Sequence, residues 1–143
     1  MSDQISERLL DQRLRNRIME ALWNLADGDD YVSRMGRDEY FCAFFDFMSM
    51  DDQPYPNSAM SPDEARALED VCTLMNTAAD ATPKTLTWRQ LIASGWPRRI
   101  QPHAEQALAI FLERGRFDEA VEQDAPSFAE GQAWRYGTTG KST

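Results

Sequence analysis

Two kinds of side chain in this sequence could in principle do chemistry: the thiols of Cys42 and Cys72, and the adjacent carboxylates of Asp29-Asp30 and Asp51-Asp52. A nucleophilic cysteine needs surroundings that favour the thiolate, whereas both cysteines stand in apolar helical stretches that disfavour it. Calcium and magnesium need several carboxylate oxygens at spaced loop positions, and neither acid pair has that spacing. We therefore expect two reduced, buried cysteines and two pairs of solvated loop charges.

Two short motifs look like known sites but lack essential parts. His103-Ala104-Glu105 has the order of one half of the zinc deaminase signature, but the Pro-Cys-x-x-Cys half is absent. Because the chain has one histidine and two cysteines, we expect no tetrahedral zinc site and no other cofactor. The sequence Gly137-Thr138-Thr139-Gly140-Lys141-Ser142-Thr143 imitates a phosphate-binding loop, but Arg135 stands where the first glycine must be. We expect residues 137–143 to be a flexible tail.

The balance of charge argues against nucleic-acid binding. The chain has 15 Lys and Arg against 24 Asp and Glu, a net charge of −9, whereas affinity for nucleic acid comes largely from basic side chains that release counterions. Arg98-Arg99 beside Trp96 could grip a phosphate, but in so acidic a protein we expect these arginines to pair with its own carboxylates. No direct nucleic-acid binding is therefore predicted.

The sequence carries no sign of export or of a membrane anchor. Residues 1–7 lack the basic start and the apolar run of a secretory signal. Charges interrupt every apolar run well before the ~20 residues that a bilayer requires. We expect a cytoplasmic protein that makes no contact with a membrane.

Most of the excess negative charge lies in residues 27–64. That segment holds ten acids and two arginines, a sum of −8, together with seven of the fifteen aromatic residues. Aromatic anchors inside an acidic rim suit a protein-binding surface, because the rings give desolvated contacts and the charge steers a basic partner. The predicted partner-binding residues are Asp29, Asp30, Tyr31, Asp51, Asp52 and Tyr55. The alternative is a core helix over residues 40–48, flanked by solvated loops.

Apolar residues at three- and four-residue steps predict an all-α, compact bundle of about five helices. A chain of 143 residues is the usual size of one domain, and we assign residues 1–136 to it. The expected helices run from Ser6 to Ala26, from Ser33 or Arg37 to Met48, from Ser61 to Ala79, from Thr87 to Gly95 and from Pro102 to Gly115, with a last turn or two around residues 117–121. A long acidic loop, residues 49–60, separates the second and third helices.

Local signals support several of these helices. Ser61 with Glu64, and Thr87 with Gln90, have the spacing of capping boxes. Asp11 and Arg15 stand four residues apart in the favourable order, and we expect both on the polar side of the first helix.

These features favour a binding protein without catalysis that engages a basic protein, in the manner of an immunity protein, an antitoxin or another inhibitor. We expect a monomer or a weak dimer, with no catalytic, metal-binding or cofactor-binding residue. Two alternatives stay open. A small enzyme would use carboxylates from different helices, with Arg98 or Arg99, in a pocket that only the fold assembles. A structural subunit of a larger assembly would use the broad apolar arc of the helix at residues 40–48.

Overall fold

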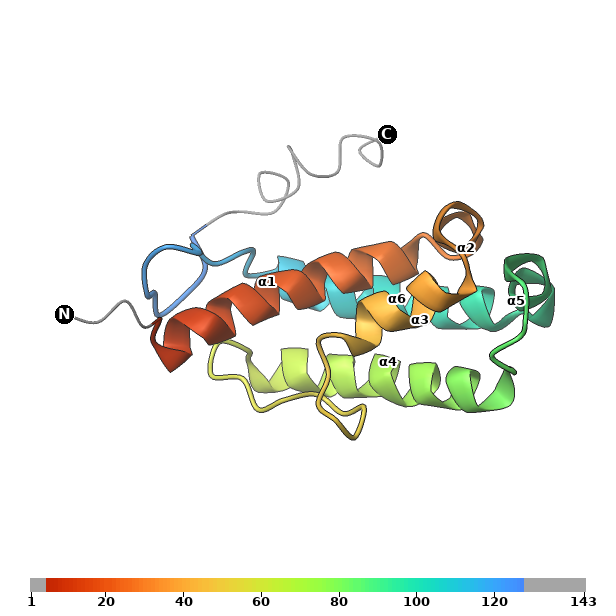
Figure 1. Cartoon of the computed structure of the whole chain (residues 1–143). Coiled ribbons are helices and arrows are strands. Elements are labelled where there is room, and N and C mark those ends of the chain that lie inside the picture. The colour runs from red at the N-terminus through yellow and green to blue at the C-terminus, as the bar shows by residue number, and fades with distance from the viewer. Residues whose placement is uncertain (1–4, 128–143) are drawn as a thin grey trace.

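The computed structural model describes residues 5–127, and within that range every regular element is a helix. The helices are α1 (Glu7–Ala26), α2 (Asp29–Met35), α3 (Arg37–Phe45), α4 (Pro62–Ala81), α5 (Trp88–Ser94) and α6 (Trp96–Leu112). Figure 1 shows α1, α4 and α6 as three long helices, with α6 antiparallel to the other two. The predicted all-α class is confirmed, with six helices among the described residues in place of about five.

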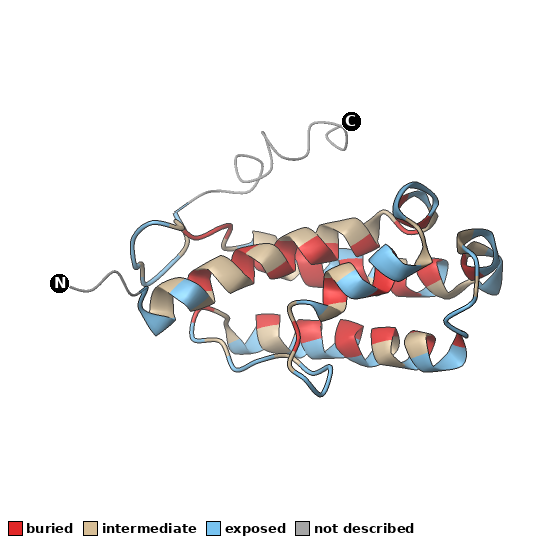
Figure 2. Ribbon diagram, viewed as in Figure 1, coloured by how far each residue is buried: buried red, intermediate tan, exposed pale blue. Residues whose placement is uncertain are grey.

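An apolar core fills the space between these helices. α6 packs along both α1 and α4, while α3 packs on α1, and α5 on α2 and α6. Figure 2 shows the buried residues on the faces that the helices turn toward one another. The largest apolar side chains that are fully buried are Met19, Leu22, Leu25, Tyr40, Phe44, Leu68, Met75, Leu91, Ile100, Phe111 and Phe117. Removal of this apolar surface from water is the main force that holds the helices together.

Of the two starts predicted for the second helix, Arg37 is the one observed, and the residues before Gly36 form a separate short helix, α2, that was not predicted. Gly36 separates α2 from α3 with a φ of +91°, which favours glycine and which a continuous helix cannot contain. The acidic residues 29 and 30 lie in the first turn of α2, where the helix dipole favours negative charge, and not in a turn of their own. α3 then ends at Phe45 rather than at Met48.

Both predicted capping boxes are present. The Glu64 backbone N–H donates to Ser61 Oγ at 3.2 Å, and the Ser61 N–H donates to Glu64 Oε1 at 3.0 Å. Thr87 and Gln90 make the same pair of bonds at 3.2 and 2.9 Å. These bonds satisfy N–H groups that the first turn of a helix leaves without partners, so α4 and α5 begin where the sequence predicts.

The last helix begins earlier than predicted. α6 starts at Trp96, directly after Gly95 in the left-handed conformation with φ +86°, and Pro97 lies in its first turn. Pro102, which we expected to open this helix, lies inside it at an exposed position. Both prolines have the fixed φ that suits a helix start. The sequence alone does not tell which of them marks it.

No helix follows α6 in the described part of the chain, so the turn predicted around residues 117–121 is absent. The residues after α6 instead lie beside the N-terminal half of α1 (Figure 1). We call residues 116–124 the strap. The predicted tail, residues 137–143, lies outside the described residues.

Cys72 is buried as predicted, but Cys42 is exposed. α3 buries Tyr40, Phe41 and Phe44, and helical geometry places Cys42 away from that stripe. Among residues 5–127, no helix combines the length and the apolar character that crossing a membrane demands.

Candidate functional site

The six predicted partner-binding residues do not form one surface. Asp29, Asp30 and Tyr31 open α2, whereas Asp51, Asp52 and Tyr55 lie in the loop between α3 and α4. Figure 1 places α2 and this loop in separate parts of the molecule. Each group is therefore a separate candidate.

At the start of α2, the fold already engages two of the three residues. Tyr31 is 4% exposed and packs on Tyr40, with ring centroids 6.1 Å apart. Burial raises the pKa of Tyr31. Asp29 Oδ2 accepts a hydrogen bond from Arg98 Nη1 at 3.1 Å. Tyr31 is therefore part of the core, and Asp29 pairs with Arg98. Of the three residues, only Asp30 is exposed and available to a partner.

The two adjacent arginines are both engaged within the chain. Arg98 pairs with Asp29, as expected. Arg99 instead stacks on Trp96, with the guanidinium carbon 4.1 Å from the ring centroid, which is within cation–π range.

In the loop, residues 49–53 form a tightly hydrogen-bonded turn, the 49–53 turn. The Asp52 N–H donates to the Ser49 carbonyl at 2.8 Å, and the Ser49 N–H donates to the Gln53 carbonyl at 2.7 Å. Asp52 has a φ of +57°, and its carbonyl accepts bonds from Asn76 Nδ2 at 2.9 Å and from the Cys72 thiol at 3.0 Å. The turn is therefore fastened to α4.

Cys72 acts in this turn as a hydrogen-bond donor. Burial raises the pKa of its thiol to about 11, and the nearby charges of Asp52 and Glu69 contribute. The thiol therefore stays protonated at neutral pH, and a nucleophilic role, which needs the thiolate, finds no support.

The 49–53 turn presents an apolar side chain among carboxylates. Met50 is 97% exposed, and Tyr55, shortly beyond the turn, is 47% exposed. Asp51 and Asp52 are also exposed, and neither makes an ion pair with a described residue. All three loop residues that the sequence analysis selected are therefore accessible.

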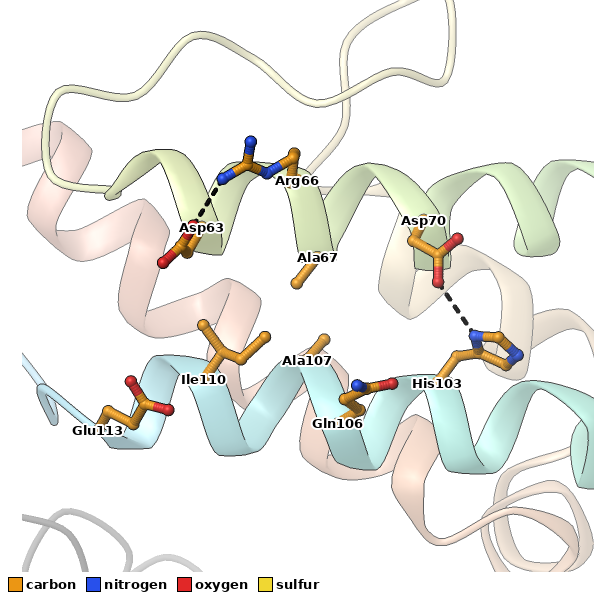
Figure 3. Close-up of a pocket in the computed structure, with 9 residues that line it drawn as sticks. All are labelled: Asp63, Arg66, Ala67, Asp70, His103, Gln106, Ala107, Ile110 and Glu113. Atoms are coloured by element: carbon orange, nitrogen blue, oxygen red, sulfur yellow. Dashed lines mark hydrogen bonds and ion pairs between the residues drawn. The ribbon is translucent and has the colours of Figure 1, made fainter.

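A groove of about 330 Å³, the α4/α6 groove, lies between two of the long helices (Figure 3). Ala67 and Ala107 point toward each other between the helices, and their small size leaves the space that forms the groove. The remaining lining residues are Asp63, Arg66, Asp70, His103, Gln106, Ile110 and Glu113. This groove was not predictable from the sequence, because its residues come from helices far apart in the chain.

A histidine–carboxylate pair stands at one end of the α4/α6 groove. His103 Nδ1 lies 3.0 Å from Asp70 Oδ2, and such a carboxylate fixes the orientation of an imidazole. Acyl transfer would also need a hydroxyl or thiol within reach, and no Ser, Thr or Cys lines the groove. At the other end, Asp63 accepts a bond from Arg66 at 2.6 Å. Of the charged side chains that line the groove, Glu113 makes no ion pair with a described residue, and the lining does not form a complete catalytic set.

Metal binding finds no support in the part of the chain that the structure describes. Nowhere in residues 5–127 do three His, Cys, Asp or Glu side chains come close enough together to hold an ion.

The strongest electrostatic feature is an ion triad of Arg15, Glu64 and Arg114, in which the side chain of Arg114 is 33% exposed. Arg15 is fully buried and Glu64 is 1% exposed. Glu64 accepts two bonds from Arg15, at 3.0 and 2.8 Å, and two from Arg114, at 2.9 and 2.8 Å. Burial alone would raise the pKa of Glu64, but the hydrogen bonds from Arg114 and Arg15 outweigh it and lower that pKa to about 2. Arg15 thus lies in the core and not on the polar side of α1, which corrects the prediction from its spacing to Asp11.

The triad is a structural tie. Arg15 also donates to the carbonyls of Gly115, at 2.7 Å, and Phe111, at 3.2 Å. Each charge therefore has partners inside the protein, as buried charges require. The triad joins α1, the start of α4 and the end of α6.

Side chains of α1 also form hydrogen bonds with backbone groups of the strap. Asn16 Nδ2 donates to the Phe117 carbonyl at 2.9 Å, and the Phe117 N–H donates to Asn16 Oδ1 at 3.1 Å. Gln12 donates to two strap carbonyls and accepts from the Gln123 N–H at 2.7 Å. Gln12, Arg15 and Asn16 are spaced as one face of a helix. That polar stripe can be seen in the sequence, but the sequence does not indicate which segment covers it.

The arginine side chains are engaged within the fold. Every arginine among residues 5–127 binds a carboxylate or a backbone carbonyl, or stacks on a ring. Of the 22 carboxylates in the same range, 14 make no ion pair with a described residue. The number of carboxylates without an ion pair is therefore larger than the net charge of −9 suggests.

Comparisons of the chain with protein families, with curated proteins and with solved structures found no match.

Proposed function

We propose that this chain is a binding protein without catalysis, and that it engages a basic partner protein through its acidic surface. The observation that carries the proposal is the excess of carboxylates without ion pairs, among arginines that are all engaged within the fold. A partner rich in Lys and Arg would supply the missing counter-charges and would be steered toward this surface over about a Debye length.

The accessible part of the predicted surface supports this role. Met50 offers an apolar contact at the tip of the 49–53 turn, and Asp51 and Asp52 surround it with negative charge. The bonds from Asn76 and Cys72 hold the turn in one conformation. A preorganised contact loses less entropy on binding than a mobile one.

A carboxylate–arginine enzyme pocket finds less support. Arg98 and Arg99 are engaged with Asp29 and Trp96, and neither lines the α4/α6 groove. His103 has its orienting carboxylate, but the lining offers no nucleophile.

The test is a comparison of three forms of the full chain as baits in extracts of the native host. The first is the wild type, and the second, Asp30→Asn/Asp51→Asn/Asp52→Asn, removes three exposed charges but leaves Asp29 to hold Arg98. The matched control, Asp80→Asn/Glu122→Gln/Asp124→Asn, removes three exposed charges elsewhere. We expect the wild type and the control to capture a basic protein in stoichiometric amount at about 0.15 M salt.

The triple variant should capture less of that protein, with a slower association rate at low salt and a smaller difference at high salt. Absence of any stoichiometric basic partner from the wild-type capture would contradict the proposal. Equal rates for all three baits would leave the function standing but would remove the predicted residues from the contact.

A further inference from the structure

A second groove, of about 600 Å³, lies between α1 and α6, and we call it the α1/α6 groove. Its lining residues are Trp23, Ala26, Asp27, Glu105, Leu108, Ala109, Leu112 and Glu113. Glu113 also lines the α4/α6 groove, so the two grooves flank α6 on either side.

The groove has an apolar floor that follows the two helix axes. Leu108 and Leu112 stand one turn apart on α6, and Trp23 and Ala26 stand at helical spacing on α1. Ala109 is exposed, and its small side chain leaves the groove open along the centre of α6. Glu105 and Glu113 lie eight residues apart, about 12 Å along the helix at 1.5 Å per residue.

The rim of this groove is negative. Its lining includes three carboxylates and no Lys, Arg or His. Asp27 accepts a bond from Arg34 at 2.8 Å, so Glu105 and Glu113 are the carboxylates that remain for a ligand. Glu105 and Glu113 are exposed and make no ion pair with a described residue. The α4/α6 groove differs here, because its lining includes Arg66 and His103.

We propose that the α1/α6 groove is the docking site of an amphipathic helix from the basic partner, with its apolar stripe on the floor and Lys or Arg side chains beside Glu105 and Glu113. This inference rests on the proposed function and adds a contact for the same partner besides the 49–53 turn. A helix that binds in a groove contacts it through apolar side chains at positions i, i+3 or i+4, and i+7. The apolar residues Leu108 and Leu112 are four residues apart on α6, which is the same spacing.

The lining chemistry selects a helix over an extended peptide. An extended chain brings backbone N–H and C=O groups that need partners once they are buried. The carboxylates of the lining could accept from the N–H groups, but apart from the Trp23 indole the lining has no side chain that could donate to the C=O groups, and the groove lies between helices whose backbone groups are already paired. A helix satisfies its own backbone bonds and offers only side chains.

The test uses a fluorescein-labelled synthetic peptide of about four helical turns, with Leu on one stripe and Lys on both flanks. A scrambled peptide of the same composition and a Lys→Glu peptide are the ligand controls. Fluorescence anisotropy gives the Kd for the full-length wild type at low and high salt. Backbone amide shifts in NMR spectra then report where the peptide binds.

Two variants target the groove, and each has a matched control. Ala109→Lys fills the floor and adds a positive charge, and Ala81→Lys makes the same change at the exposed end of α4. Glu105→Gln/Glu113→Gln removes two charges from the rim, and Asp80→Asn/Glu122→Gln removes two elsewhere. We expect Ala109→Lys to weaken binding roughly tenfold or more, and the rim variant to weaken it roughly threefold at low salt and less at high salt. The controls should bind as the wild type does.

Amide shifts at Ala109 and Leu112 with these losses would support the proposal. Shifts confined to the 49–53 turn, with both groove variants binding normally, would overturn it while the proposed function stands. No binding by the peptide, together with no basic partner in the capture experiment, would overturn both. Self-association that Ala109→Lys abolishes, without peptide binding, would assign the groove to a second copy of the chain and overturn the proposal.

Discussion

Glu64→Gln should destabilise the protein strongly, and by an amount that depends on pH. Gln has nearly the shape of Glu and keeps a carbonyl oxygen for the Ser61 N–H, so the capping box survives. Two things are lost: the negative charge between Arg15 and Arg114, and the acceptor Oε2 of the bonds from Arg15 Nη2 at 2.8 Å and Arg114 Nε at 2.9 Å, since the Gln amide nitrogen only donates. Removing one partner of a buried ion pair costs about 3–5 kcal/mol, because it leaves a buried charge without compensation.

The pKa of Glu64 gives an independent magnitude. The fold lowers it from 4.5 to about 2, so the ionised carboxylate contributes about 3 kcal/mol at pH 7. Because the folded pKa is the lower one, this stability is fully present above the unfolded value of 4.5 and is lost as the pH falls toward 2. At pH 3 about 1 kcal/mol of it remains, so the wild type should lose about 2 kcal/mol that the variant does not lose.

Urea unfolding of both proteins at pH 7 and pH 3 measures this difference. The free energy of unfolding should differ by about 3–5 kcal/mol at pH 7 and by about 2 kcal/mol less at pH 3. Ser61→Ala is the control, because loss of a cap costs about 1 kcal/mol and involves no titrating group. A gap between wild type and Glu64→Gln that is the same at both pH values would refute the assignment of the triad as a charged tie.

Three further outcomes are expected. Asn16→Ala should destabilise the protein by about 2–3 kcal/mol, because the buried N–H and C=O of Phe117 lose their partner. Hydrogen exchange of the strap amides should also accelerate, and unchanged exchange would show that Asn16 does not hold the strap on α1. Cys42 should react with a thiol reagent in the folded protein, whereas Cys72 should react only after unfolding. Equal reaction rates of the two thiols would contradict the burial of Cys72. Gly28→Ala and Gly36→Ala should lower the melting temperature by similar amounts, since both positions have positive φ and the Cβ at residue 28 would meet only the flexible end of the Gln101 side chain; a much larger loss at residue 28 would contradict this.

The parts of the fold that the sequence predicted are those with local causes. The start of α4 follows from Ser61, Pro62 and Glu64, which lie within four residues of one another and act on the first turn alone. The sequence left the start of the second helix open between Ser33 and Arg37, and it placed the start of α6 at Pro102 and not at Trp96, because each start depends on a choice between two acceptable local conformations. Packing against the rest of the molecule makes that choice.

The burial of Arg15 had no local cause. Its spacing to Asp11 is that of a surface ion pair, and only the arrival of Glu64 and of the Gly115 carbonyl makes a buried position tolerable. Partners this far apart in sequence leave no trace in a helical pattern. The polar stripe formed with Gln12 and Asn16 was visible, but nothing in the sequence said that the strap would cover it.

The candidate surface was predicted in part. Averaging charge over residues 27–64 found Asp51 and Asp52, which are exposed, but it also selected Tyr31, which is buried. The same averaging passed over Glu105 and Glu113, which stand among apolar residues of α6. They share one groove only because α1 packs beside α6, so the fold concentrates charge that the sequence spreads out.

The acidity of the surface follows from the way the interior is held together. Arg15 and Arg114 share the single carboxylate of Glu64, so two positive charges have only one negative counter-charge between them. Arg8 and Arg13 bind backbone carbonyls of the strap, which carry no formal charge. In each of these contacts an arginine is bound within the fold, and no surface carboxylate serves as its counter-charge. The carboxylates left over lie outside, and a basic partner is the ligand that such a surface stabilises best.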